Sequence, residues 1–366
     1  MRPLRLLAAV TGSPRLLAAA PCTGTAPVHV PPDGLSGAGG TAPAPDRPSS
    51  RTRLRAWAEL LRVSALFTVP GDALAGAAAT GRRPGRGTAL AVGASLCLYE
   101  AGMALNDWAD REEDAADRPH RPIPSGRVAP GAALAAAGAL TAAGLALAAR
   151  AGRPALAVAS GLAATVWAYD LRLKHTRLGP AAMASARALD LLLGATATAG
   201  AAPAAPGPVG THAAPGPAGA HPPSAALPAA LALGAHTYAV TAVSRHEVQG
   251  GSTAAPLAAL AGAAGLGAAA LRGRPAHGEP SPAPATGTLL LPAFVAAYLR
   301  TAAVPLLHAA LNPSPPLTQR AVGGGIRAMI PLQATLAARA GSPLVGLAAM
   351  GLVPLARALS RKVSPT

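Results

Sequence analysis

The chain has 366 residues, of which 51% are hydrophobic and 13% charged, and its formal net charge is +16. Soluble domains carry about 25% charged residues, so this composition excludes an ordinary soluble domain and favours a helical membrane protein. The arginines stand at the ends of apolar segments, not along one polar face, which argues against a nucleic-acid partner and favours membrane lipid or a phosphorylated substrate.

The first segment of the chain is rich in Pro, Gly, Ser and Thr. Its first 22 residues loosely resemble a signal peptide, but Pro14 and Arg15 interrupt the apolar run. We therefore expect 1–52 to be a disordered tail, 53–360 to form a transmembrane domain and 361–366 to be a short C-terminal tail.

Apolar segments of near-spanning length then follow one another along the chain. A bilayer core needs about 20 apolar residues per helix, and alternation typical of membrane strands is absent. The sequence therefore predicts an all-α polytopic bundle of eight or nine spans, the last of them long or broken, with a possible helix start near Ala321. The predicted spans are 56–80, 88–106, 130–150, 154–171, 178–201, 225–244, 253–272, 287–308 and 328–358. A soluble Ala-rich helical protein is the alternative; it would need polar helix faces that most of these segments lack.

The connecting segments are of two kinds. Two of them, 202–224 and 273–286, are rich in Pro and Gly, and we expect flexible loops without a functional role. Three others, 107–129, 170–177 and 244–253, hold many of the charges. Because they follow the second, fourth and sixth spans, they must lie on one membrane face, which the arginines near the first span predict to be cytoplasmic.

Six of the 15 acidic residues fall between Asp107 and Asp117, within the run NDWADREEDAAD. On a continuous helix the spacing of Asp107, Asp110 and Asp114 places all three carboxylates on one face, with Asn106 adjacent. Clustered carboxylates at a membrane are costly unless a divalent cation neutralises them. Mg²⁺ prefers oxygen ligands and shares its coordination with substrate phosphates. The other acids, Glu112, Glu113 and Asp117, are expected to face water or to pair with Arg111 and Arg118.

The run RPHRPIPSGRV follows directly, with Pro and Gly residues that predict a stiff turn. Its arginines, Arg118, Arg121 and Arg127, carry planar forks that can bind diphosphate oxygens. Anchoring of a cytoplasmic loop is the alternative role for each of them.

The two runs together, NDWADREED and RPIPSG, resemble the signature of the UbiA superfamily of intramembrane prenyltransferases. The resemblance covers about 56–358 and points to the actinobacterial or EboC-like branch. It implies a bundle of about nine spans that uses Mg²⁺ to bind a prenyl diphosphate. It also implies that the metal–diphosphate ligands are Asn106, Asp107, Asp110 and Asp114.

Two further loops bear on this resemblance. After the fourth span, YDLRLKHTRLG matches the family at Tyr169, Arg172 and Lys174, which implies diphosphate contacts, and Asp170 is a local partner for Lys174. After the sixth span the family carries a second Asp-rich motif, whereas this chain reads SRHEVQGG. Either Glu247 alone completes a metal site there, or Arg245 supplies the positive charge; His246 has an acid–base role or none.

Ionisable residues also occur inside predicted spans. Arg62 is a candidate to hold diphosphate, whereas Asp72 lies further into the first span, towards its far end or an acceptor cavity. Arg187 and Asp190 have the spacing of a structural pair on the fifth span.

We therefore expect a prenyltransferase of class EC 2.5.1 that moves a prenyl group from its diphosphate to a small acceptor, which we expect to be aromatic. Asp107, Asp110, Lys174 and Glu247 are the catalytic candidates, Mg²⁺ is the cofactor, and no obligate protein partner is inferred. The alternative is a membrane transporter or lipid-binding protein that uses the acids for ions, but such acids belong near the bilayer midplane.

Overall fold

The computed structural model describes residues 50–62, 68–200, 220–272 and 285–363, and every regular element in those ranges is a helix. The predicted tail over 1–52 and the two Pro/Gly-rich loops lie almost entirely outside the described residues. The elements are α1 (Ser50–Leu60), α2 (Val69–Ala79), α3 (Arg86–Ala109), α4 (Arg111–Asp117), α5 (Pro130–Ala151), α6 (Arg153–Ala168), a π-helical turn η3 (Tyr169–Leu173), α7 (Gly179–Gly200), a 3₁₀ turn η4 (Pro223–Ala226), α8 (Leu227–Ser244), α9 (Ala254–Arg272), α10 (Ala285–Leu311), α11 (Pro315–Arg339) and α12 (Pro343–Val363).

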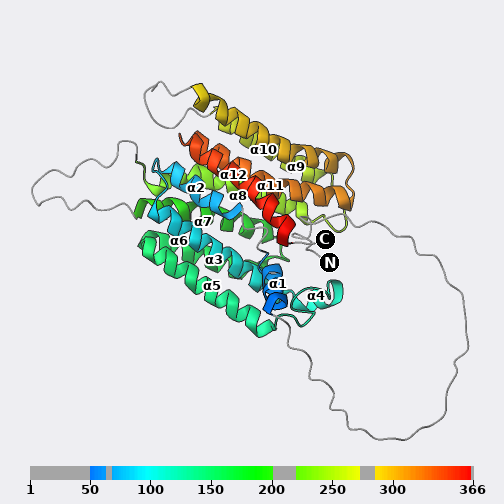
Figure 1. Cartoon of the computed structure of the whole chain (residues 1–366). Coiled ribbons are helices and arrows are strands. Elements are labelled where there is room, and N and C mark those ends of the chain that lie inside the picture. Colours follow the sequence, from blue (N-terminus) through cyan, green and yellow to red (C-terminus); the bar gives the residue numbers. More distant parts are fainter. Residues whose placement is uncertain (1–49, 63–67, 201–219, 273–284, 364–366) are drawn as a thin grey trace, which may run out of the picture.

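The long helices form a layered bundle, with α3, α5 and α6 on one side and α9 and α10 on the other (Figure 1). α7 packs against α2, α6 and α8, and α11 packs against α8, α10 and α12. Five helices in the described ranges are long and apolar enough to cross a membrane: α3, α5, α8 with η4, α9 and α10 from Leu289. The prediction of an all-α transmembrane bundle is confirmed.

Two predicted spans are wrong in their extent. The segment 56–80 contains two helices, because α1 ends at Leu60 and α2 starts at Val69 with Pro70 in its first turn, where the missing N–H costs nothing. The last span, expected to be long or broken, is broken: α12 begins at Pro343 after a turn at Gly341, whose φ is +80°. Its first helix, α11, begins at Pro315, well before the predicted start at 328.

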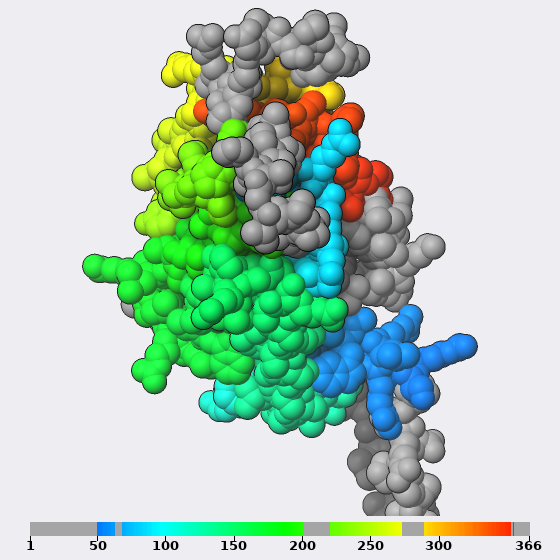
Figure 2. Space-filling model, turned by 90° about the vertical axis from the view of Figure 1, so that its left-hand side faces the viewer, coloured from blue at the N-terminus to red at the C-terminus, as the bar shows by residue number. Residues whose placement is uncertain are grey.

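α1 and α4 lie at one end of the bundle, beside the C-terminal end of α3 (Figure 1). In the space-filling view α1, in blue, stands out from the helices next to it (Figure 2). The three charged connections predicted to share a face do meet at this end. Lys174 contacts Asp110, and Arg245 donates to the Thr176 carbonyl over 2.8 Å. At the other end, the His221 amide donates to the Thr80 carbonyl over 2.9 Å.

α2 and α7 approach each other closely through glycine. A Cβ on Gly194 would lie 2.4 Å from the Cα of Ala73, and a Cβ on Gly76 would lie 2.1 Å from the Leu191 carbonyl oxygen. Such small residues let membrane helices pack backbone against backbone. The contact holds α7, which follows η3 and its charged turn, against the middle of the bundle.

An ion-pair network inside the bundle joins the same helices. Arg187 on α7 pairs with Asp72 over 2.5 Å and lies 4.0 Å from Asp190, so the predicted partner Asp190 is the more distant one. Gln333 on α11 donates to Asp72 over 2.6 Å, and Ser95 on α3 hydrogen-bonds Asp190. Asp72 is therefore not an isolated acid near an acceptor cavity; its carboxylate is held by α7 and α11.

We predict that Gly194→Ala destabilises the protein by about 1–3 kcal/mol, because the new methyl group overlaps the α2 backbone. Thermal unfolding in detergent measures the effect as a lower midpoint. Gly138→Ala in α5 is the matched control, since a Cβ there meets nothing within 4 Å. Equal midpoints for the two variants would contradict the close α2–α7 contact.

We predict that Arg187→Met destabilises the protein more than Arg187→Met combined with Asp72→Asn. Removing one partner of a buried ion pair costs about 3–5 kcal/mol because a charge stays buried without compensation, whereas removing both is far less costly. Thermal unfolding in detergent compares the two variants. A double variant no more stable than the single one would show that Arg187 does not serve to neutralise Asp72.

Candidate functional site

The acidic motif lies where α3 ends and α4 begins. Asp107 belongs to the last turns of α3, Asp110 ends that helix, and Asp114 lies within α4. The expected single helix face is wrong, because the α-helix stops at Asp110, whose φ and ψ are −90° and 4°. All three side chains nevertheless turn inward and are almost completely buried, with exposures of 3%, 6% and 1%.

Arginines bring the first and third carboxylates together. Arg121 donates from one nitrogen to Asp107 over 2.9 Å and to Asp114 over 3.1 Å. Arg118 forms an ion pair with Asp114 over 2.5 Å, so it does not pair with the outer acids as expected. Buried carboxylates are stable only with such charged partners. The loop RPHRPIPSG thus closes over the end of α3 through its own arginines.

Arg62 completes the contacts of Asp107 from the other side. Its Nη2 donates to Asp107 over 2.9 Å, and its buried Nη1 has no hydrogen-bond partner among the described residues. Its φ is +49°, an unusual value for a residue other than glycine. The predicted place of Arg62 beside the motif agrees with the structure, and one of its donors is free for a ligand.

The turn after α6 supplies the partner of Asp110. Lys174, which follows the π-helical turn η3, contacts Asp110 and is itself 9% exposed. The expected pair with Asp170 is not formed; instead Asp170 accepts a hydrogen bond from Asn106 over 3.2 Å. Tyr169 is buried in the same turn. After the π-helical turn, Asp170 therefore contacts Asn106, and Lys174 contacts Asp110 of the acidic motif.

Three predicted diphosphate ligands lie outside this cluster. Arg127 binds Glu59 of α1 over 2.7 and 3.2 Å, and its hydrogen bond to that carboxylate raises the pKa of the arginine. Arg245 is exposed and donates to the Thr176 carbonyl. Arg172 is exposed and has no recorded polar contact with another described residue.

Glu247 lies in the turn after α8 and is only 1% exposed. Neither carboxylate oxygen has a hydrogen-bond partner in the described part of the chain, and burial raises the pKa of the group to about 8. A carboxyl group with such a pKa is largely protonated at neutral pH unless a cation reaches it. Its two orphan oxygens fit a metal-binding role better than a structural one.

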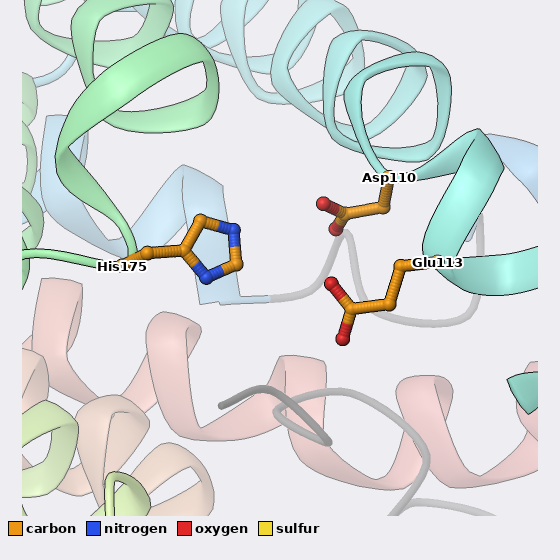
Figure 3. Close-up of side chains that lie close together, drawn as sticks. All are labelled: Asp110, Glu113 and His175. Carbon is orange, nitrogen blue, oxygen red and sulfur yellow. The ribbon is translucent and has the colours of Figure 1, made fainter. Parts of the chain in front are cut away.

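The structure adds two residues that sequence reasoning missed. Glu113, expected to face water, is half-buried in α4, and His175 follows Lys174 in the turn before α7. The ligand atoms of Asp110, Glu113 and His175 all lie within 4.8 Å of one another, and the side chains face a common point (Figure 3). A further acid, Glu100 in α3, is buried with no partner among the described residues.

Comparison with known proteins places this geometry in a family. The pattern of the UbiA prenyltransferase family matches residues 64–303, well over half of the chain. A digeranylgeranylglyceryl phosphate synthase from Methanopyrus kandleri is 36% identical over 130 residues, which are 34% of this chain and 46% of that protein. The enzyme of the same name from Ignicoccus hospitalis is 37% identical over 148 residues, or 40% and 48% of the two chains. The chain thus spans about half the length of these relatives.

Solved structures show the same fold. A UbiA homolog from Archaeoglobus fulgidus bound to GPP and Mg²⁺ superimposes with a TM-score of 0.52 at 19% identity, covering 81% of this chain and 99% of the homolog. The same homolog bound to DMAPP and Mg²⁺ gives a TM-score of 0.53 at 17% identity over the same shares. These relatives do not point to the actinobacterial or EboC-like branch suggested by the sequence. The chain belongs to the UbiA prenyltransferase family.

Proposed function

We propose that the protein is an intramembrane prenyltransferase that moves a prenyl group from a prenyl diphosphate to a hydroxyl of a glyceryl phosphate-type acceptor, with Mg²⁺ as cofactor. The observation that carries this proposal is the buried cluster at the end of α3, where three carboxylates face four cationic side chains. The participants are Asp107, Asp110, Asp114, Arg62, Arg118, Arg121 and Lys174.

The residues present fit a divalent cation. Asp107, Asp110 and Asp114 offer carboxylate oxygens, the ligand type that Mg²⁺ prefers, and Glu247 adds two buried oxygens without a partner among the described residues. Asn106, next to Asp107 at the end of α3, adds a side-chain amide. When bound, the cation supplies positive charge that stabilises the departing diphosphate. The homolog structures with GPP or DMAPP and Mg²⁺ support this assignment.

The arginines and the lysine have a second task in this proposal. In the structure they neutralise the carboxylates, and the same donors can turn to phosphate oxygens when a diphosphate arrives. Arg62 can bind a phosphate oxygen without giving up its contact with Asp107, because its Nη1 has no partner among the described residues. The ion pairs therefore hold the donors close to the positions where a leaving group develops charge, which is the arrangement that lowers a barrier most.

The reaction then requires a dry site. The bond between prenyl C1 and the diphosphate oxygen breaks and the diphosphate keeps the electron pair, while the acceptor oxygen bonds to C1 and its proton passes to the released diphosphate. Water would compete with the acceptor, and the apolar bundle above Asp107 excludes it. Alanine and leucine from α3 and α5 pack there, as Ala104, Leu105, Ala133 and Ala137 illustrate.

The acceptor assignment departs from the aromatic one expected from the sequence. Both named relatives are digeranylgeranylglyceryl phosphate synthases, and their names describe a glyceryl phosphate that carries prenyl groups. An alcohol of this type is amphipathic and can enter from the membrane with its phosphate at the charged end of the bundle. Family membership also favours the enzyme over the transporter alternative.

We further propose that the active site faces the cytoplasm of a cell membrane. α1 carries Arg51, Arg53 and Arg55 and lies at the end of the bundle that holds the acidic motif. Basic residues next to spans favour the cytoplasmic side.

The proposal predicts Mg²⁺-dependent transfer to a glyceryl phosphate ether and none to a hydroxylated aromatic acid. Membranes containing the protein are incubated with labelled geranyl, farnesyl or geranylgeranyl diphosphate and either acceptor, with Mg²⁺ or with EDTA. Asp107→Asn, which keeps the side-chain shape but removes its charge, should lower transfer at least about 100-fold. Transfer to the aromatic acid alone would contradict the glyceryl phosphate assignment and support the aromatic acceptor expected from the sequence.

The contacts also predict different roles for two arginines of the same loop. Arg121→Gln removes the donor shared by Asp107 and Asp114, and we expect kcat/KM for the prenyl diphosphate to fall about 100-fold or more. Arg127→Gln, its matched control, breaks an exposed pair with Glu59, and such pairs contribute about 0–1 kcal/mol to stability. We expect kcat/KM of that variant to stay within about threefold of wild type. Equal losses of kcat/KM in the two variants would indicate that Arg127 also binds the diphosphate.

A further inference from the structure

Asp110, Glu113 and His175 form a mixed oxygen and nitrogen group beside the diphosphate motif (Figure 3). Each comes from a different element: the end of α3, the first turn of α4 and the turn between η3 and α7. One ligand atom from each lies within 4.8 Å of the other two. We call these three residues the Asp–Glu–His group.

Two contacts fix the elements that carry the group. Lys174, the neighbour of His175, binds Asp110 and so ties the turn before α7 to the end of α3. Arg245 donates to the carbonyl of Thr176, the other neighbour, over 2.8 Å. The imidazole is thus presented from a turn that is held on both sides.

The three side chains have unused coordination capacity. Asp110 is 6% exposed, and Lys174 contacts only its Oδ1, so the other oxygen has no recorded partner in the described structure. No hydrogen bond or ion pair joins the side chain of Glu113 or of His175 to another described residue. The second oxygen of Asp110 is not fully buried, so a cation can reach it, and the groups that face it are themselves ligand types.

We propose that Asp110, Glu113 and His175 together bind one divalent cation, through two carboxylate oxygens and one imidazole nitrogen. This inference rests on the proposed function and deepens it by naming the cation ligands and the cation preference. First-row transition ions, Mn²⁺ included, accept an imidazole nitrogen more readily than Mg²⁺ does, whereas Mg²⁺ favours oxygen ligands and retains its waters. The chain therefore binds Mn²⁺ more tightly than a site made of carboxylates alone.

Charge and distance are compatible with this assignment. Two carboxylates and the nearby Lys174 ammonium sum to one negative charge, which attracts a cation although the lysine reduces the attraction. Two ligands of one ion at about 2.0–2.2 Å each lie about 3–4 Å apart. Because His175 is exposed and Glu113 half-buried, rotation of their side chains closes the remaining gap.

The test observes the nitrogen ligand directly. Mn²⁺ is added to purified protein without a polyhistidine tag, and pulsed electron paramagnetic resonance records nitrogen couplings to the ion. We expect a ¹⁴N coupling in wild type that becomes a ¹⁵N coupling when histidine alone is ¹⁵N-labelled. His175→Gln should abolish it, whereas His221→Gln, at the opposite end of the bundle, should keep it.

Affinity measurements add a second readout. His175→Gln should raise the Kd for Mn²⁺ about tenfold or more, and that for Mg²⁺ less than about threefold. Glu113→Gln should weaken both ions, with Glu112→Gln as the matched control because that side chain is 87% exposed and pairs with Arg111. The absence of a histidine coupling in wild type, or its persistence in His175→Gln, overturns the inference.

The same preparation separates this inference from the proposed function. If prenyl transfer depends on Mg²⁺ but no histidine coupling is seen, the Asp–Glu–His group is not a cation site, and the enzyme assignment still holds. A histidine coupling without transfer from any prenyl diphosphate to any acceptor tested retains the cation site and removes the proposed reaction.

Discussion

The site depends on one physical constraint: carboxylates buried at the end of an apolar bundle need positive charge within hydrogen-bonding distance. Asp107, Asp110 and Asp114 meet this need through arginines and a lysine contributed by separate segments of the chain. Each of those cations must therefore reach the end of α3, and this draws α1, the loop after α4 and the turn after η3 together. The electrostatic need that shapes the local fold is the same one that suits a metal–diphosphate ligand.

A second charged group in the bundle serves a different purpose. Arg187 is shared between Asp72 and Asp190, and Gln333 and Ser95 complete their hydrogen bonds. Here the partners come from rigid helices, and the network lies beside the glycine contact of α2 and α7. At the end of α3, by contrast, the cations stand on turns, and Arg62 and Glu247 keep polar atoms without a partner among the described residues. The paired charges of Asp72 and Arg187 stabilise the fold, whereas the unpaired atoms of Arg62 and Glu247 can accept a ligand.

Much of the fold and part of the site could be predicted from the sequence. The spans that became α3, α5, α8 and α9 were placed within a few residues, because long apolar runs with polar ends mark them clearly. The convergence of three charged loops followed from the alternation of faces alone. The break after Leu60 was missed because the apolar composition is continuous across it, whereas the break near Gly341 was left open in the prediction of a long or broken last span. A hydropathy pattern reports burial, and it is insensitive to a change of chain direction within an apolar run.

The missed ligand candidates have a related physical cause. Glu113 follows Asp110 by three residues, a spacing that makes the two residues neighbours on a helix. We nevertheless expected Glu113 to face water together with the other outer acids, whereas the structure places it half-buried beside Asp110. His175 joins them only because the π-helical turn η3 shifts the side-chain register by one residue, so that Lys174 and its neighbour both face α3. The π-helical turn, a local departure from ideal α-helix, precedes the residue that completes this group, and departures of this kind are where sequence periodicity loses its predictive value.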